Sequence, residues 1–497
     1  MSCKQIDCKI LNILYLACLP SPTKAIFAAV KRKKFTIENL TVTGYAAEGK
    51  SLARIDGKVI FIEGAVPGDV VDVFITKNKK DWAEGKAKKI KELSKERTTP
   101  FCIHFGICGG CKWQMLPYEK QLEYKEQESR DAFKRIGKLA DVPVLPIIGS
   151  EKTIHYRNKL EFTFSNKKFL PPDELKALGD DEWPGGALGY HVPRLYDKII
   201  DIYECWLMAD VNNLIRNSLR DYTKMNNCSY YDIKDHTGWL RNIIIRNCTT
   251  GELMVNLIFA HDDEEQRNNI CNYLLEKVPQ ITTLVYTINP KWNDSINDLE
   301  PKIVSGKGYV IEKLASFNFK ISPKSFFQTN TKQAEVLYNV VKDFAALTNN
   351  EIVYDLYCGT GSIGIFLSRL AKKIIGVDVI SDAIDDAKEN ARLNDLDHAS
   401  FYSGDVIDIC NDEFFEIHGR PDVIIVDPPR AGLHTKLINK IIEISPPKII
   451  YVSCNVATQA RDLQLLNEKF IVEQLQPVDM FPHTHHIECV ALLKLRN

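Results

Sequence analysis

Apolar and polar residues are patterned differently in successive parts of the chain. Short apolar or alternating runs occur at residues 35–45, 58–61 and 69–75, separated by glycine-containing turns. This pattern predicts a small β domain over residues 34–95. After it, residues 117–139 combine helical spacing with dense charge, which predicts a helix.

The middle of the chain has a mixed pattern. Strand-like runs at residues 159–164, 239–246 and 253–259 alternate with polar connections. We therefore expect a mixed α/β central domain over residues 96–325.

The rhythm changes in residues 326–497. A helical stretch at residues 331–347 leads into a short apolar strand at residues 351–356, which ends in a glycine-rich turn. Further strand-like runs follow, most of them separated by helical stretches, at residues 373–379, 399–403, 423–426, 449–453 and 489–495. This alternation is typical of a doubly wound α/β sheet.

The first 33 residues do not fit these domains. Residues 10–18 faintly resemble the apolar part of a signal peptide, but Pro20 and Pro22 follow at once. We expect neither export nor a membrane span, and a folded part that begins near Lys31. Residues 1–33 are then a disordered extension or an artefact of start-site choice.

The cysteine content narrows the class of protein. The chain has 14 cysteines, of which Cys102, Cys108 and Cys111 stand close together while the others scatter. A reduced cytoplasmic protein with a metal centre fits this distribution better than a disulfide framework. The thiols alone leave zinc and an iron–sulfur cluster equally open.

Charge has to be considered locally. The formal net charge of −1 does not indicate a polyanionic partner. A basic tract nevertheless occupies residues 77–97. It is either a solvated helix face or a surface that contacts phosphates.

The turn at residues 355–364 has the composition of a cofactor loop. Gly359, Gly361 and Gly364 let a ligand approach the backbone and let the following helix pack on the strand. Their spacing also matches the dinucleotide pattern, so NAD and S-adenosylmethionine (SAM) both remain open here. Asp378, at the end of the next strand, suits ribose hydroxyls in either case.

Sequence further along favours SAM. Asp427 ends a strand and is followed by two prolines, a stiff loop that suits a flat base and that a dehydrogenase does not need. Asp405 follows another strand, where its side chain either reaches the adenine or belongs to a plain turn.

Cys454 and Glu488 suggest covalent chemistry. Cys454 ends a strand, and strand ends form the active edge of such sheets. A thiolate that adds to carbon 6 of uracil makes carbon 5 nucleophilic toward a methyl donor. A base must then remove the proton from carbon 5, and Glu488, just before the last strand, is the natural candidate. Taken alone, Cys454 is more typical of a buried structural thiol, and only its context favours a nucleophile.

Together these motifs resemble the bacterial RNA (uracil-5-)-methyltransferases, most closely the 23S ribosomal RNA enzymes that carry an iron–sulfur cluster. Over residues 34–497 five motifs occur in family order, namely the β module, Cys-x5-Cys-x2-Cys, Phe-Gln-x-Asn, Asp-x-Tyr-Cys-Gly-x-Gly and Ser-Cys-Asn. The resemblance implies a TRAM domain, an OB-like β-barrel that binds RNA, at residues 34–95. It also implies a Rossmann-like SAM-dependent methyltransferase domain at residues 326–497.

The resemblance assigns roles to individual residues. It makes Cys454 the nucleophile and Glu488 the base. It implies that SAM is contacted by Gln328, Tyr357, Ser362, Asp378, Asp405 and Asp427. Cys205 matches the family's fourth cluster ligand, which implies a [4Fe–4S] cluster on Cys102, Cys108, Cys111 and Cys205. Because methyl transfer moves no net electrons, we expect that cluster to serve structure or RNA docking.

Ribosomal RNA is the favoured substrate, because the transfer RNA relatives of this family generally lack the TRAM module and the cluster. We expect a cytoplasmic monomer with no membrane or protein partner. The alternatives are methylation of transfer RNA, an NAD-linked oxidoreductase that uses the glycine-rich loop and Cys454, and a non-catalytic RNA-binding protein.

Overall fold

The computed structural model describes residues 35–178 and 185–496. The expected extension at residues 1–33 lies outside them. Within the described residues, no helix is both long enough and apolar enough to cross a membrane.

A six-stranded sheet in the order β1-β5-β6-β4-β3-β2 forms the N-terminal part. Its strands are β1 (Thr36–Thr41), β2 (Gly44–Tyr45), β3 (Ser51–Ile55), β4 (Lys58–Glu63), β5 (Val70–Asn78) and β6 (Trp82–Glu92), with a short turn η1 (Ala47–Gly49) after β2. Its core includes Ala53, Ile62 and Val73. Most of the basic tract is strand β6, which exposes Lys86, Lys88 and Lys89, so the interpretation as a helix face is wrong.

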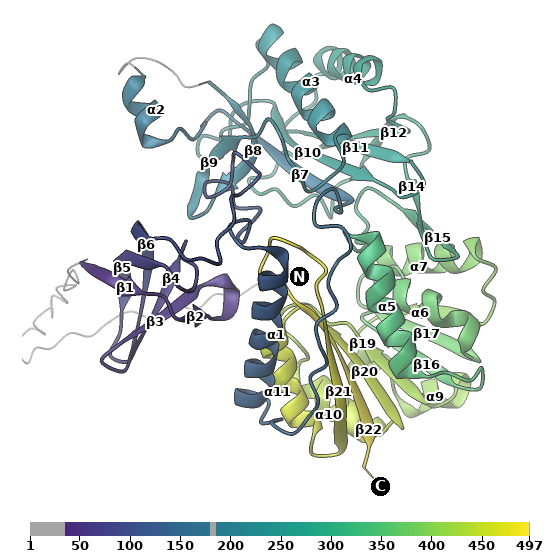
Figure 1. Cartoon of the computed structure of the whole chain (residues 1–497). Helices are drawn as coiled ribbons and strands as arrows, with labels where there is room; N and C mark the ends of the chain where they lie inside the picture. The colour runs from purple at the N-terminus through teal and green to yellow at the C-terminus, as the bar shows by residue number, and fades with distance from the viewer. Residues whose placement is uncertain (1–34, 179–184, 497) are drawn as a thin grey trace, which may run out of the picture.

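The central part is a seven-stranded sheet in the order β13-β12-β11-β10-β7-β8-β9. Helices α3 (Val211–Met225) and α4 (Glu264–Lys277) pack on the sheet through an apolar core that contains Phe162, Leu219 and Leu257 (Figure 1). The strands are β7 (Lys159–Ser165), β8 (Ala187–Val192), β9 (Leu195–Asp201), β10 (Leu240–Asn247), β11 (Leu253–Phe259), β12 (Thr283–Ile288) and β13 (Lys302–Ser305). Helix α2 (Pro172–Ala177) lies in the connection between β7 and β8, and the hairpin β14 (Val310–Leu314) and β15 (Phe317–Ile321) leads onward.

The C-terminal part is the doubly wound α/β sheet that the pattern predicts, in the order β18-β17-β16-β19-β20-β22-β21. All neighbours pair in parallel except β22, which is antiparallel to both β20 and β21. The strands are β16 (Ile352–Leu356), β17 (Lys373–Asp378), β18 (Ala399–Ser403), β19 (Val423–Val426), β20 (Lys448–Ser453), β21 (Phe470–Val478) and β22 (Glu488–Leu495). The helices are α5 (Thr331–Ala345), α6 (Ser362–Leu367), α7 (Ser381–Leu393), α8 (Val406–Ile409), α9 (Asp412–His418), α10 (Thr435–Ile444) and α11 (Val456–Leu466), with the short η2 (Ser368–Leu370) after α6.

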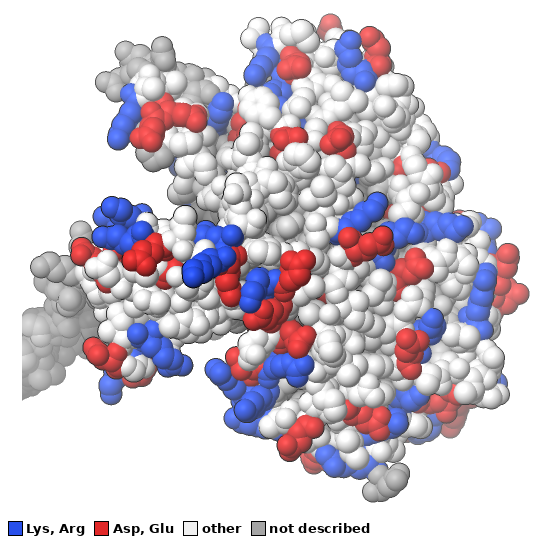
Figure 2. Space-filling model, in the orientation of Figure 1, with Lys and Arg blue, Asp and Glu red and all other residues white. Residues whose placement is uncertain are grey.

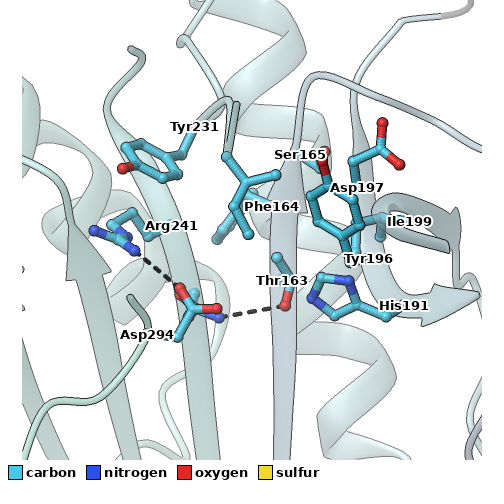
Figure 3. Close-up of a pocket in the computed structure, with 12 residues that line it drawn as sticks. Thr163, Phe164, Ser165, His191, Tyr196, Asp197, Ile199, Tyr231, Arg241 and Asp294 are labelled. Atoms are coloured by element: carbon cyan, nitrogen blue, oxygen red, sulfur yellow. Dashed lines mark hydrogen bonds and ion pairs between the residues drawn. The ribbon is translucent and has the colours of Figure 1, made fainter. Parts of the chain in front are cut away.

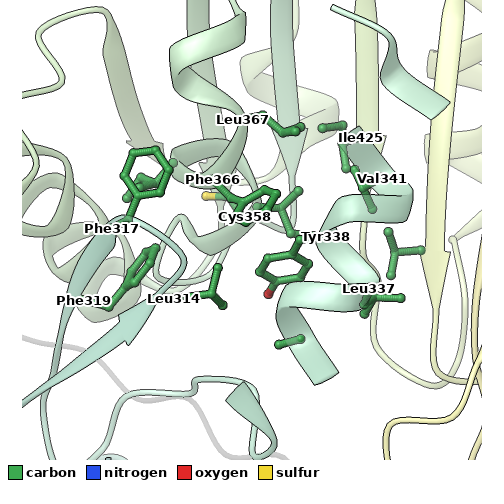
Figure 4. Close-up of a cluster of buried hydrophobic side chains, with 14 of the residues drawn as sticks. Leu314, Phe317, Phe319, Leu337, Tyr338, Val341, Cys358, Phe366, Leu367 and Ile425 are labelled. Carbon is green, nitrogen blue, oxygen red and sulfur yellow. The ribbon is translucent and has the colours of Figure 1, made fainter. Parts of the chain in front are cut away.

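Each face of this sheet has its own core. One core joins α5, α6 and the β14–β15 hairpin to the sheet through Tyr338, Phe366 and Phe319 (Figure 4). The other joins α10 and α11 to the opposite face and includes Phe133 of α1 (Tyr118–Arg135). Helix α1 therefore packs beside α11, although it precedes the central sheet in the sequence (Figure 1).

Within the C-terminal sheet, β21 is the strand that the pattern did not predict. Its sequence includes Gln474, Gln476 and Pro477, which break the apolar alternation typical of a strand. Pro477 is tolerated because β21 is the last strand of the sheet. Beyond it, Val144 and Ile148 form only isolated bridges to the strand.

Candidate active site

Strand register brings Cys454 and Glu488 together. Ser453, the last residue of β20, pairs with Cys489 of the antiparallel strand β22. Continuing that register by one step sets Cys454 opposite Glu488. On the other side of β20, strand β19 ends at Val426, so Asp427 leaves the sheet at the same edge.

The electrostatics of the two side chains confirm that they are close. Burial raises the pKa of Cys454 to about 11, the carboxyl groups of Glu488 and Asp427 add to this, and Arg430 opposes it. Burial also raises the pKa of Glu488 well above its ordinary value. Near neutral pH, the site therefore holds a neutral thiol beside a carboxyl group of unusually high proton affinity.

Cys454 and Arg430 line an open pocket of about 800 Å³, which also reaches Ile487, the residue before Glu488. Cys454 and Arg430 come from loops at the edge of the C-terminal sheet, and His485 and His486 come from the loop ahead of Glu488. The remaining walls come from elsewhere in the chain: η1 of the N-terminal sheet contributes Ala47 and Glu48, and α1 contributes Glu128. Burial raises the pKa of Glu128 to about 7, and the backbone N–H of Glu48 opposes this.

Sequence analysis did not identify Glu48 or Glu128. Glu48 has a φ of 63°, in the left-handed region, within a three-residue turn. Neither residue belongs to a motif, and both reach the pocket only because distant segments dock there. No local pattern in the sequence signals that docking.

The glycine-rich loop lies between β16 and α6, as predicted. Gly359 and Gly361 have φ values of 53° and 76°, a region that glycine enters without strain. The N–H of Gly359 donates to Asp378 Oδ2 at 2.9 Å, and the N–H of Ile380 donates to Asp378 Oδ1 at 3.0 Å. The side chain of Asp378 therefore holds the glycine-rich loop in place through its hydrogen bond to Gly359. Apart from the neighbours of Gly359 in the chain, no atom of the described residues lies within 4 Å of a Cβ built on it, so the loop has open space beside it.

Tyr338 of α5 connects two further predicted residues. Its hydroxyl group is 2.8 Å from Ser362 Oγ and also hydrogen-bonds to the side chain of Gln328. Tyr357 lies close enough to Asp405 and Asp378 for their charges to raise its pKa, although burial is the larger cause. The structure therefore gathers Gln328, Tyr357, Ser362 and Asp378 around one loop. Tyr338, which holds two of them, carried no signal in the sequence.

Asp405 has a structural task. Its Oδ1 accepts from the N–H of Ile407 at 2.9 Å and caps α8. The interpretation as a turn residue thus holds for this side chain. Its proximity to Tyr357 still places it beside the loop.

Two carboxyl groups lie under the loop, of which Asp355 is buried and Asp427 half-buried. Burial raises the pKa of both Asp427 and Asp355 to about 7. Asp355 Oδ2 accepts from the N–H of Gly364 at 2.8 Å, whereas its buried Oδ1 has no hydrogen-bond partner among the described residues. Uncompensated acidic groups of this kind suit a cationic ligand.

Cys102, Cys108, Cys111 and Cys205 also come together. They line one cavity of about 400 Å³ at the side of the central sheet. Burial raises the pKa values of Cys108 and Cys111 to about 12, and neighbouring cysteines add to the effect. Within the described residues, no three His, Cys, Asp or Glu side chains are arranged to hold a single metal ion.

A further pocket lies on the central sheet (Figure 3). The Arg241–Asp294 ion pair at 2.9 Å and the hydrogen bond from Asn242 to Thr163 at 3.3 Å lie within it. None of the predicted site residues lines it. The molecular face in Figure 2 intersperses basic and acidic side chains, so it gives no separate indication of a site.

Alkylation tests the electrostatics of Cys454. Only the thiolate reacts with iodoacetamide, so we expect slow labelling of Cys454 near neutral pH and a rise as the pH approaches its pKa of about 11. R430A should slow labelling, because it removes the positive charge that favours the thiolate. E488Q should speed it where Glu488 is ionised, by about tenfold for each unit by which the pKa falls. Peptide mass spectrometry measures the rate, and fast labelling at neutral pH that neither variant changes would contradict this account.

Comparison with known proteins gives the family. A model described as tRNA (Uracil-5-)-methyltransferase matches residues 247–496, and the TRAM domain model matches residues 31–88. A relative from Bacteroides thetaiotaomicron, named an uncharacterized RNA methyltransferase, is 50% identical over 455 residues, which are 91% of this chain and 100% of that protein. A Porphyromonas gingivalis relative with the same name is 46% identical over 460 residues, 91% of this chain and 99% of its own.

A solved structure agrees with them. Pyrococcus abyssi tRNA (uracil-54, C5)-methyltransferase, in complex with S-adenosyl-L-homocysteine, superposes with a TM-score of 0.70 and 27% identity, covering 91% of this chain and 99% of that one. The predicted α/β fold with an N-terminal TRAM domain is confirmed, and the oxidoreductase alternative is wrong. The chain belongs to the SAM-dependent RNA (uracil-5-)-methyltransferase family, with a TRAM domain at its N-terminus.

Proposed function

We propose that this protein methylates carbon 5 of a uridine in RNA, with Cys454 as the nucleophile and Glu488 as the base. The observation that carries the proposal is the register of β20 and β22, which sets these two residues side by side at the active edge. The pocket that Cys454 lines is walled in part by η1 of the TRAM domain and by α1, so distant segments would contact a base that enters it.

The residues around the glycine-rich loop fit SAM. The open space beside Gly359 leaves room for a ligand against the backbone. Val379 and Ile380, each 59% exposed, follow Asp378 and offer an apolar surface for the adenine. Asp427 and Asp355 match a cationic ligand, and Gln328, Tyr357, Ser362 and Asp378 would contact it. Bound SAM supplies the electrophilic methyl group.

Cys454 and Glu488 divide the remaining chemistry. The Cys454 thiolate adds to carbon 6 of the uracil, and the electron pair displaced to carbon 5 forms the new bond to the methyl group. Glu488 then takes the proton from carbon 5, the double bond between carbons 5 and 6 reforms, and the sulfur leaves. The raised proton affinity of Glu488 suits a general base that works near neutral pH. The positive charge of Arg430 favours the thiolate.

Ribosomal RNA remains our first candidate substrate, as the resemblance implies. Transfer RNA is the second, and one observation favours it. The Pyrococcus abyssi enzyme, whose name gives tRNA uracil-54 as its target, covers 91% of this chain, a share too large to leave out the TRAM domain. A TRAM domain thus does not by itself separate the two substrates. Either RNA, and a thiol that must stay reduced, favours the cytoplasm.

We further propose that Cys102, Cys108, Cys111 and Cys205 hold a [4Fe–4S] cluster. Four thiols around one cavity fit a cubane, which presents a separate iron to each ligand. A zinc ion would need all four sulfurs about 2.3 Å from one point. The segment that follows Cys111 is hydrogen-bonded to the loop ahead of Glu488, since the N–H groups of Lys112 and Trp113 donate to the carbonyl oxygen of His483 at 2.8 and 3.1 Å. The cluster would therefore serve structure.

The cluster can be tested by metal analysis. Anaerobically purified protein should contain about four iron and four sulfide per chain, with the visible absorbance of an iron–sulfur centre. C108S and C205S should lose most of both, whereas C228S, which alters a thiol outside that cavity, should keep them. Stoichiometric zinc without sulfide would refute the cluster.

The RNA activity can be tested in cells. Deletion of the gene should remove 5-methyluridine from a specific position in ribosomal RNA, and the intact gene should restore it. C454A should restore none, and the near-isosteric E488Q should be slower by about 10²- to 10⁴-fold, because it loses the base. Sequencing and nucleoside mass spectrometry provide the measurement. Loss of 5-methyluridine from transfer RNA alone would make transfer RNA the substrate. Full restoration by C454A would refute the covalent mechanism and the role of Cys454 as nucleophile.

A further inference from the structure

The loop between β21 and β22, residues 479–487, forms no helix or strand in the structure. It leads directly into Glu488, and Val478 at its other end pairs with Glu488 across the two strands. The position of Glu488 therefore depends on both ends of this loop. Its internal hydrogen bonds span only two or three residues, as from the N–H of Thr484 to the carbonyl oxygen of Phe481, so outside contacts are needed to hold the whole segment in one conformation.

Helix α1 supplies the strongest of those contacts. Lys125 Nζ donates to Asp479 Oδ1 at 2.7 Å and to the carbonyl oxygen of Phe481 at 3.3 Å. The hydroxyl group of Tyr118 donates to Asp479 Oδ2 at 2.8 Å. The N–H of His483 donates to Gln121 Oε1 at 2.8 Å. Tyr118, Gln121 and Lys125 are spaced by three and four residues, so one face of α1 holds the loop.

Other segments of the chain also hydrogen-bond to the loop. Asn330 Nδ2 donates to the carbonyl oxygen of Met480 at 2.9 Å, and the hydroxyl group of Tyr156 donates to that of Pro482 at 3.1 Å. Every residue from 479 to 483 is thus bonded to a part of the chain outside the loop. The Lys125–Asp479 pair is the only contact among these that joins two charged side chains, and both are 0% exposed.

Because the Lys125–Asp479 ion pair is fully buried, its role can be inferred from the energetics of buried charges. Removing two charges from water costs about as much as their attraction returns, so a buried ion pair contributes little to stability and is better suited to fix one geometry. Asp479 meets each donor with a different oxygen, which sets its orientation as well as its position. The residue so fixed is next to Val478, the partner of Glu488.

We propose that Lys125 and Asp479 are positioning residues for the methyl-transfer reaction, which hold the 479–487 loop so that Glu488 meets the proton on carbon 5. This inference rests on the proposed function, because it assumes that Glu488 is the base. It assigns a specific step to the pair: formation of the Cys454–uracil bond and methyl transfer do not need Glu488. Only the last step does, in which the proton passes to Glu488, the double bond reforms and the bond from sulfur to carbon 6 breaks.

The two halves of the reaction can be measured separately. RNA from cells that lack the gene and were grown with 5-fluorouracil traps the methylated covalent complex, because fluorine cannot leave as a cation. Trapping therefore reports every step before the base acts. Turnover on RNA from the same cells grown without 5-fluorouracil also requires the base. E488Q provides the reference, since it should trap normally and also accumulate the complex on ordinary RNA.

K125M and D479N should resemble E488Q. We expect trapping at the parent's rate, turnover reduced by about 10²-fold as for a misplaced catalytic group, and accumulation of the complex on ordinary RNA. R130M is the matched control, because it breaks the ion pair with Glu126 on the exposed side of the same helix and should change neither rate. The complex is measured on denaturing gels and turnover as 5-methyluridine by mass spectrometry.

Two results would overturn the inference alone while the parent still traps. One is turnover in both K125M and D479N equal to that of R130M. The other is trapping that falls together with turnover, which would make the pair a support of the whole fold rather than of the base. Failure of the parent itself to trap would instead overturn the proposed function, and this inference with it.

Discussion

The active edge depends on the insertion of one antiparallel strand, β22, between β20 and β21. In a purely parallel sheet, all strands run the same way, so the residues at this edge would all be ones that follow the C-terminal end of a strand. Because β22 runs the other way, the residue that begins it, Glu488, arrives at the same edge as Cys454, which follows β20. The proposed nucleophile and base therefore meet because the backbones of β20 and β22 are hydrogen-bonded to each other, and the long loop ahead of Glu488 has to be secured from outside the sheet.

Burial sets the electrostatic character of this edge. Asp355, Asp427, Glu128 and Glu488 all have pKa values raised by the removal of their carboxyl groups from water. Their mutual repulsion adds to the effect where they are close, and Arg430 is the main opposing charge at Cys454. Such a site holds its thiol neutral and is matched to ligands that bring positive charge or hydrogen-bond donors.

The sequence predicted the parts of this picture that rest on local patterns. The βαβ alternation, the glycine-rich loop with Asp378, and the helix at residues 117–139 follow from periodicity and turn chemistry, and the structure has them at those positions. Cys454 and Glu488 were identified from strand ends and from family motifs. The structural role of Asp405 as a helix cap was one of two interpretations that the sequence left open.

What the sequence could not give depends on contacts between distant segments. Strand β21 was missed because Gln474, Gln476 and Pro477 obscure its alternation, and without β21 the antiparallel position of β22 cannot be inferred. Glu128 and Lys125 belong to an ordinary charged helix until α1 docks beside α11. In the sequence, Tyr338 is typical of a core aromatic residue. Only the structure shows that its hydroxyl group hydrogen-bonds to Ser362 and Gln328.

The central claim is that Cys454 forms a covalent bond to uracil next to Glu488. The most direct measurement is the mass of the peptide that carries the RNA after trapping with 5-fluorouracil-containing RNA, nuclease digestion and proteolysis. The account predicts a single modified peptide, which contains Cys454 and is heavier by a methylated 5-fluorouridine nucleotide. A complex attached through another cysteine, or no complex with enzyme that methylates ordinary RNA, would contradict it.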